Sequence, residues 1–212
     1  MYLDITAIDK IRESTKPCII PFSAQGYGGE RPQEEINHLS VVAEIWEDIL
    51  IQARSQNKPS LFDRRTDILC AGNLKNRFGL SLAKDMENFL SDSLYGTWRF
   101  FPASLLIAEE NSCHTGHQVR EMRDFILEQR YDLLILVSNY WHLKRICKLI
   151  RYWYDDIPIL PIASPTSGSI FYRFFNAIKE IGLYLMVCTI DFDGKFWDRV
   201  IEKRTLNASQ KP

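Results

Sequence analysis

The sequence predicts one three-layer α/β domain built around a parallel sheet of about five strands. Short apolar runs alternate with amphipathic helical segments along the chain, which is typical of repeated β-α-β units. The run Tyr131–Ser138 is almost wholly apolar, as expected of a central parallel strand buried on both faces. A length of 212 residues with 46% hydrophobic residues suits a single well-packed core. We therefore expect a Rossmann-like domain.

The expected strands are short apolar runs that end in polar residues or glycine. They are Cys18–Phe22, Thr66–Gly72, Ser104–Ala108, Tyr131–Ser138 and Ile157–Ala163. Apolar spacings of three and four residues predict helices around them. These are Ile5–Ile11, a segment from Glu34, Ser81–Leu90, a segment ending at Gln129, a segment after Asn139, and Ile170 to about Thr189. We expect residues 1–16 to form an N-terminal helix, 17–193 the α/β domain and 194–212 a C-terminal tail.

The last helix is distinctive because its second half, Ile181–Ile190, is apolar all round. Such a helix is buried deeply in its own chain or in a contact between subunits. Ile170, Phe174, Ala177, Ile181 and Tyr184 recur along this helix at spacings of four and three residues. The same pattern indicates a possible homodimer through this helix.

Charge and cysteine content narrow the function classes. The formal net charge is −1 and there is no dense Lys/Arg block, so a general nucleic-acid binder is not expected. The five cysteines are an odd number without a CxxC pair, which favours free thiols in a reducing compartment. The first residues do not resemble a secretion signal, and Ile181–Ile190 is too short to span a bilayer. We expect a cytoplasmic protein without a membrane span.

Polar side chains gather where two expected strands end. Glu109 follows the third strand, and Ser112 and Thr115 stand where the next helix begins. Ser138 and Asn139 end the fourth strand, and a second helix start follows with His142 and Arg145. In parallel α/β sheets, ligands bind outside the carboxyl ends of the strands, next to helix N-termini. These two stretches are therefore expected to form two walls of one anion-binding site.

Glycines follow the first and second strands. Gly26 and Gly28 lie in the segment SAQGYGG, and Gly72 ends the second strand. Glycine allows a ligand to approach the backbone closely, so all three are candidate ligand contacts. The pattern is not GxGxxG, and a flexible glycine loop explains Gly26 and Gly28 equally well.

The other candidates also have structural explanations. Thr115 and Gln118 fit a capping box, in which side chains satisfy the first amides of a helix. Glu109 is a surface acid or an ion-pair partner of Arg145 in the simplest alternative. His142 and Arg145 share one helical face, and the alternative to a ligand site is that this face is simply solvated. These alternatives stay open.

A metal site is the remaining chemical alternative. His114 and His117, with Cys113 and Glu109, provide potential ligands, but the spacing is not HExxH and no third ligand set is evident. A helix N-terminus lowers the pKa of a thiol, but we consider a nucleophilic Cys113 even less favoured than a metal site. We predict no metal, and we treat His114 and His117 as bystanders.

Three stretches together resemble a known family. LLIAEE followed by Ser112 and Thr115, then LLILVSNYWHLKR, then IPILPIAS are similar to the YdcF/SanA/ElyC-like domain family of unknown function. Its hallmarks are an acid just before S-x-x-T, and a strand ending in V-S/T followed by H-x-x-R. They correspond here to Glu109, Ser112 and Thr115, and to Ser138, His142 and Arg145. Glu180 matches the family's ending, whereas His38–Ser40 stands where an arginine is usual.

The resemblance implies a small-molecule site for a nucleotide-like or phosphorylated ligand, such as a cell-envelope precursor. S-adenosylmethionine or another nucleotide is a possible cofactor. In the first hypothesis the protein is an enzyme, a transferase or hydrolase, with Glu109 and His142 as acid/base or hydroxyl-orienting groups. The ligand-binding residues are then Gly26, Gly28, Gly72, Ser112, Thr115, Ser138, Asn139 and Arg145. In the second hypothesis the same residues bind without turnover, in a sensing or interaction module.

Overall fold

A computed structural model describes residues 5–22, 33–55, 66–72, 80–91, 106–110, 114–190, 193 and 195–196. The described strands all belong to one parallel sheet and are flanked by helices, so the predicted three-layer α/β class is confirmed. The strands are β1 (Pro17–Pro21), β2 (Asp67–Ala71), β3 (Leu106–Glu109), β4 (Leu133–Ser138) and β5 (Ile159–Ala163). The helices are α1 (Ile5–Glu13), α2 (Gln33–Ser55), α3 (Leu82–Ser91), α4 (Thr115–Gln129), α5 (Tyr140–Trp153) and α6 (Ile170–Thr189).

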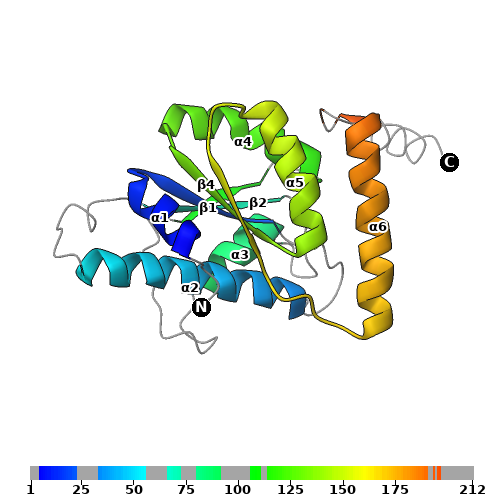
Figure 1. The fold of residues 1–212 in the computed structure, drawn as a ribbon, viewed down its shortest axis with the longest axis horizontal. Helices are drawn as coiled ribbons and strands as arrows, with labels where there is room; N and C mark the ends of the chain where they lie inside the picture. Colours follow the sequence, from blue (N-terminus) through cyan, green and yellow to red (C-terminus); the bar gives the residue numbers. More distant parts are fainter. Residues whose placement is uncertain are drawn as a thin grey trace.

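The strand order is β3-β2-β1-β4-β5, so the first strand along the chain, β1, lies at the centre of the sheet. It moves outward from β1 through β2 to β3, then crosses back to β4 on the other side of β1 and continues to β5. Crossovers between parallel strands are right-handed, so this reversal sends the later helices to the opposite face of the sheet. Figure 1 shows α2 and α3 on one side and α4 and α5 on the other.

Two apolar clusters form the core, one on each face of the sheet. The first joins α1, α2 and α3 to one set of alternating strand residues, such as Ile19, Ile68 and Ile135. The second joins α4, α5 and Val187 of α6 to the other set, such as Ile20. Every residue of β1 and β4 is buried, which accounts for the continuous apolar pattern of the predicted central strand. Edge strand β5 carries Pro161, a residue that edge strands accommodate.

The amino-terminal edge of the sheet is tied together by buried and half-buried polar groups. The Asp132 carboxylate accepts hydrogen bonds from the Thr15 amide and hydroxyl, both at 2.6 Å, and from the Lys16 amide at 3.0 Å. The Tyr131 hydroxyl donates to Asp67 at 2.5 Å. These contacts join the starts of β1, β2 and β4. They stabilise the edge of the sheet opposite the carboxyl ends of the strands.

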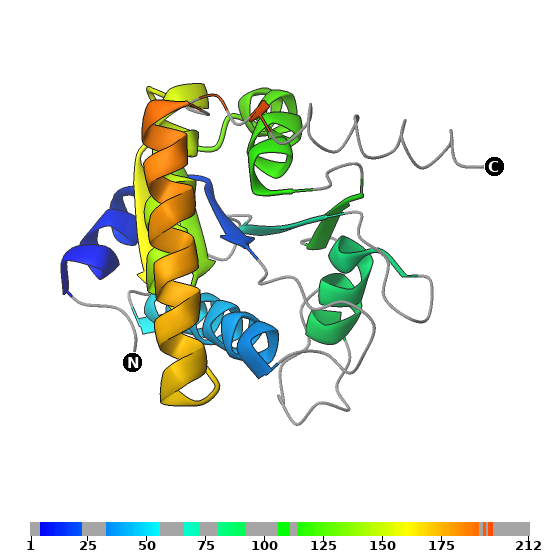
Figure 2. The ribbon, with the colours of Figure 1, turned by 90° about the vertical axis from the view of Figure 1, so that its right-hand side faces the viewer.

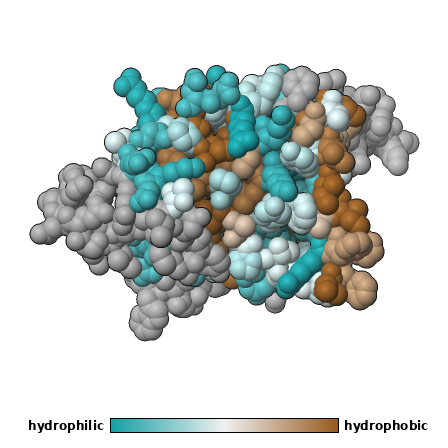
Figure 3. All heavy atoms as spheres, in the orientation of Figure 1, coloured by the Kyte–Doolittle hydropathy of each residue, from teal (hydrophilic) through white to brown (hydrophobic). Residues whose placement is uncertain are grey.

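Helix α6 lies on the outside of the molecule, so the first of its two predicted environments, deep packing within its own chain, is wrong. Ile170 is 78% exposed and Phe174 is 60% exposed, whereas Glu180 and Val187 are the buried residues of the helix. Figure 2 shows α6 running across the side of the molecule, and apolar spheres follow it in Figure 3. Deep burial within one chain is therefore excluded. Because the helix is apolar on nearly all sides, spacing alone did not identify the face that packs on α5.

Candidate functional site

The polar site lies where the direction of the chain reverses in the sheet. β1 and β4 are neighbours, yet the helices that follow them cover opposite faces. In open α/β sheets this topological switch point is the place where ligands bind, outside the carboxyl ends of the strands. Ser138 ends β4, Thr115 begins α4, and His142 lies in the first turn of α5.

Ser138, His142 and Thr115 form a chain of hydrogen bonds. The Ser138 hydroxyl donates to the Phe22 carbonyl at 2.8 Å. Its oxygen also lies 3.0 Å from His142 Nδ1, and His142 Nε2 lies 3.1 Å from the Thr115 hydroxyl. The structure thus brings together three of the predicted site residues. His142 is only 5% exposed, so the alternative of a solvated helix face is wrong for it.

The donors and acceptors available to Thr115, His142 and Ser138 fix the direction of each hydrogen bond between them. A carbonyl only accepts, so the Ser138 proton is directed at Phe22 and the Ser138 oxygen accepts from Nδ1–H of His142. Burial, followed by the positive charges of Arg145 and Lys179, lowers the pKa of His142 well below its ordinary value. The ring is therefore neutral, and Nε2 accepts the Thr115 proton. Arranged in this way, His142 can take a proton from the Thr115 hydroxyl or from a ligand that replaces it.

Asn139 holds in place the helix turn that carries His142. Its side-chain oxygen caps α5 by accepting from the His142 amide at 2.9 Å, and its side-chain nitrogen donates to Glu34 at 2.9 Å. Glu34 is buried in the first turn of α2, and burial raises its pKa. One asparagine thus connects α2 with β4 and α5. Its predicted contact with a ligand stays a prediction.

Arg145 does not pair with Glu109, the alternative considered for both residues. Its guanidinium contacts Glu180 of α6, with Nη2 at 3.1 Å and Nε at 3.2 Å from one carboxylate oxygen. The Arg145 side chain is 11% exposed and that of Glu180 is 7% exposed. This nearly buried ion pair largely neutralises the cation that we expected to hold an anion. Its partner is 35 residues further along the chain, which spacing does not predict.

The capping-box interpretation of Thr115 and Gln118 is wrong. His114 is the N-cap of α4, and its side chain accepts from the His117 amide at 3.3 Å. Thr115 is the first helical residue and directs its hydroxyl to His142, while Gln118 donates to the Ala71 carbonyl at 3.0 Å. His114 thus has a structural role in place of the threonine, and Thr115 is left for the site.

The remaining predicted site residues lie elsewhere. Glu109 ends the edge strand β3, three strand positions from Ser138, which is about 14 Å at the usual strand spacing. Gly72 has φ +139°, a backbone conformation that residues with a side chain rarely adopt, and a Cβ there would lie 3.0 Å from Leu82 and 3.1 Å from Gln118, so backbone and packing explain the glycine without a ligand. Gly26, Gly28 and Ser112 lie outside the described residues.

Sequence reasoning missed three buried polar residues at this edge. Glu34 lies on α2, and His38 lies one turn further along the same helix. Ser164 follows β5, and its amide donates to the Ser138 carbonyl at 2.9 Å. Glu34 was missed because acidic residues are common in the first turn of a helix, which explained its presence. His38 was missed because it lies within an apolar helical pattern. The one available signal was the absence at His38–Ser40 of the arginine usual in the resembled family.

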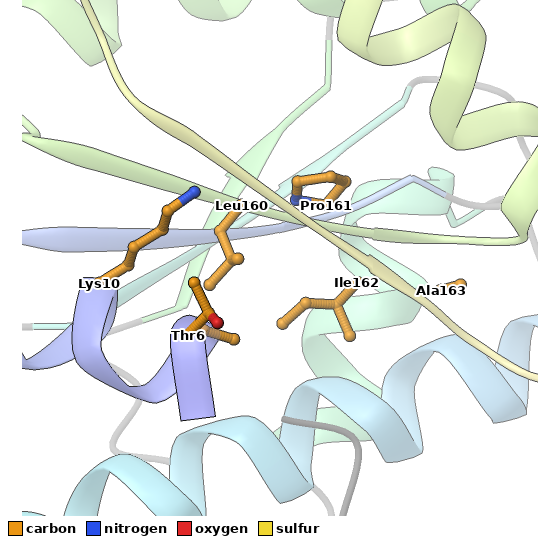
Figure 4. Close-up of a pocket in the computed structure, with 7 residues that line it drawn as sticks. Thr6, Lys10, Leu160, Pro161, Ile162 and Ala163 are labelled. Atoms are coloured by element: carbon orange, nitrogen blue, oxygen red, sulfur yellow. The ribbon is translucent and has the colours of Figure 1, made fainter. Parts of the chain in front are cut away.

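The described residues offer little for competing sites. A cavity of about 350 Å³ between α1 and β5 is lined by Thr6, Ala7, Lys10 and Leu160–Ala163 (Figure 4). No group of three or more His, Cys, Asp and Glu side chains within the described residues is placed to hold a metal ion. Among the same residues, no helix is long and apolar enough to cross a membrane.

Fold and site define the class of protein: a three-layer, Rossmann-like α/β domain with a buried polar cluster at its topological switch point. Comparison with known proteins adds no narrower identity. No family model, no curated protein and no solved structure matches the chain. Membership of the YdcF/SanA/ElyC-like family therefore stays a prediction from the motifs.

Proposed function

We propose that this protein binds a small nucleotide-like or phosphorylated molecule at the carboxyl ends of β1 and β4, and acts on it as a transferase or hydrolase. The observation that carries the proposal is the directed chain from Thr115 through His142 to Ser138 at the switch point. A neutral imidazole that already accepts a hydroxyl proton is arranged as a general base. The N-termini of α4 and α5 meet at the same place and favour an anionic group such as a phosphate.

Each residue has a role in this proposal. His142 accepts a proton from the attacking or leaving hydroxyl, and Ser138 orients its ring. Thr115 and the helix amides contact the anionic group, while Arg145, paired with Glu180, supplies weaker attraction than an unpaired arginine would. Glu109, on the far strand β3, contacts a more distant hydroxyl of an extended ligand such as a nucleotide. S-adenosylmethionine belongs to the same ligand class.

The test is a thermal-shift screen with nucleotides and sugar phosphates, followed by mass spectrometry of any stabilising compound. We expect a hit whose mass changes on incubation with the wild-type protein. The variant His142→Gln should lose both the stabilisation and the conversion. His117→Gln is the matched control, because His117 is half-buried on α4 and its ring contacts Glu121. A hit that His142→Gln binds and converts normally contradicts the proposed site.

A non-catalytic ligand-sensing or interaction module is the alternative. It is favoured by the neutralised Arg145 and by the high burial of His142, which suit retention of a ligand as much as turnover. A hit that the wild-type protein binds but returns with unchanged mass supports this alternative over the enzyme.

The proposal extends to location and assembly. Cys18 and Cys70 are free and buried, Cys147 and Cys188 are free as well, and such thiols support a place in the cytoplasm. The exposed apolar face of α6 supports pairing with a second copy of the chain, as expected from the sequence of that helix.

A further inference from the structure

Among the described residues, His38 is one of the most buried polar side chains, and its hydrogen-bonding capacity is not used there. It is 1% exposed, and within the part of the chain that the structure describes neither ring nitrogen has a hydrogen-bond partner. Buried polar groups in folded proteins almost always have partners, because leaving one unpaired is costly. A histidine retained under these conditions indicates that something outside the described chain satisfies it.

Two hydrogen bonds of neighbouring α2 residues locate His38 at the carboxyl edge of the sheet. Glu34, one turn earlier on the same side of α2, contacts Asn139 at the end of β4. Asn37, its immediate neighbour, donates to the Pro165 carbonyl beyond β5 at 3.1 Å. The turn of α2 that carries His38 therefore lies across the ends of β4 and β5.

A second unpartnered polar group lies at the same place. Ser164 is buried, its hydroxyl has no hydrogen-bond partner among the described residues, and it directly precedes Pro165. Its amide donates to the Ser138 carbonyl, which places it beside the residue that orients His142. His38 and Ser164, both without a hydrogen-bond partner among the described residues, thus lie near the same strand ends as the hydrogen bonds of Ser138 and His142.

We propose that His38 and Ser164 line a buried subsite that takes an uncharged, hydroxyl-bearing part of the ligand, such as a sugar. A neutral imidazole offers one donor and one acceptor, and a serine hydroxyl offers both, which matches the two faces of a sugar hydroxyl. Burial lowers the pKa of His38 to about 4, so the ring carries no charge at neutral pH to attract a phosphate. The inference rests on the proposed function, and it specifies that His38 and Ser164 contact the uncharged part of the ligand.

The first test uses the free protein, where the two buried histidines should behave oppositely. Replacing an unpartnered polar group by an apolar one of similar size removes an uncompensated desolvation cost. We therefore expect His38→Leu to raise the thermal midpoint of the ligand-free protein by about 2–4 °C. His142→Leu is the matched control, and it should lower the midpoint because both of its nitrogens have partners. A fall of similar size in both variants contradicts an unpartnered His38.

The second test separates the subsite from the rest of the site. Calorimetric titration compares adenosine monophosphate with inorganic phosphate on the wild-type protein, His38→Leu and His38→Gln. We expect the wild type to prefer the nucleotide, His38→Leu to bind it about tenfold more weakly with unchanged phosphate affinity, and His38→Gln to lose less.

Each other result has a defined meaning. An unchanged preference for the nucleotide in His38→Leu overturns the subsite and leaves the proposed function standing, because water alone would then satisfy the histidine. A wild-type protein that binds neither probe contradicts the proposed function, and the subsite with it.

Discussion

At the residue scale, Ser138 is the point on which the candidate site depends. Its hydroxyl joins the end of β1 to His142 by donating to Phe22 and accepting from the ring. Ser138→Ala removes both contacts and leaves a buried carbonyl and a buried N–H unpaired. We expect a loss of roughly 1–3 kcal/mol in the free energy of unfolding, measured by urea denaturation. Ser91→Ala, which removes only an exposed contact to the Asn88 carbonyl, should change it little. Equal effects would contradict the role given to Ser138.

Asp132 makes stability depend on pH at the opposite edge of the sheet. Partial burial raises its pKa, but hydrogen bonds from Ser14, Thr15 and the Lys16 amide outweigh this and lower it to about 2. A folded pKa below the ordinary value of 3.8 means that the carboxylate stabilises the protein fully above about pH 4. This contribution is lost as the pH falls through 2, since the acid then becomes protonated in both states.

The variant Asp132→Asn tests this dependence. We expect it to be less stable than the wild type by about 1–2 kcal/mol at pH 7, with the difference shrinking between pH 4 and pH 2. Chemical denaturation across this pH range measures both effects. Asp124→Asn is the matched control, because that carboxylate is almost fully exposed beside Arg123. A difference that stays constant down to pH 2 would show that the Asp132 charge contributes nothing.

Single residues also mark the limit of what the sequence predicts at the site. Thr115, Ser138 and His142 were identifiable because each lies at the end of a strand or in the first turn of a helix whose pattern is clear. His38 was not, since a histidine within an apolar helical pattern carries no sign of whether its nitrogens have partners. Glu109 was placed correctly at the carboxyl edge, but the strand order that separates it from His142 depends on the path of the whole chain.

At the element scale, one nearly buried ion pair attaches α6 to α5. Glu180→Ala leaves the Arg145 guanidinium in a low-dielectric environment without its carboxylate. We expect a loss of about 3–5 kcal/mol in unfolding free energy. The double variant Arg145→Met, Glu180→Leu should recover most of it, because two apolar side chains avoid the desolvation of both charges. Lys179→Ala is the control, since Lys179 contacts the same carboxylate from an exposed position. A double variant as unstable as the single one would contradict this account.

The strands were more predictable than the helices that cover them. β1 and β4 are buried on both faces, so their composition alone indicated central positions. In α6, by contrast, 3.6-residue periodicity fails because two opposite faces are apolar. One face packs on α5 through Val187, and the other carries large side chains that the rest of the described chain leaves exposed. A pattern identifies a buried face only when the other face is polar.

At the scale of the whole molecule, the exposed face of α6 is large enough to define an assembly. Its members share one arc of about 140° at 100° per residue: Ile170, Phe171, Phe174, Phe175, Ile178, Ile181 and Leu185. They are 39% to 78% exposed. At roughly 200 Å² for a large apolar side chain, they present on the order of 800 Å². This is about what one partner contributes to a standard protein interface.

We predict that a second copy of the chain covers this face. A two-fold contact places the same apolar arc on both sides, so it needs no complementary charge, and Gly182 within the arc has open space around it that lets another helix approach. We expect the wild type to sediment at twice the mass of a single chain at micromolar concentration. Phe174→Glu with Ile178→Glu should give a monomer of unchanged thermal midpoint, because neither side chain belongs to the core. Leu127→Glu, at an exposed leucine of α4, is the matched control and should stay dimeric. A monomeric wild type, or one that binds anionic lipid vesicles in place of a second copy, would contradict the dimer. So would a double variant that still pairs.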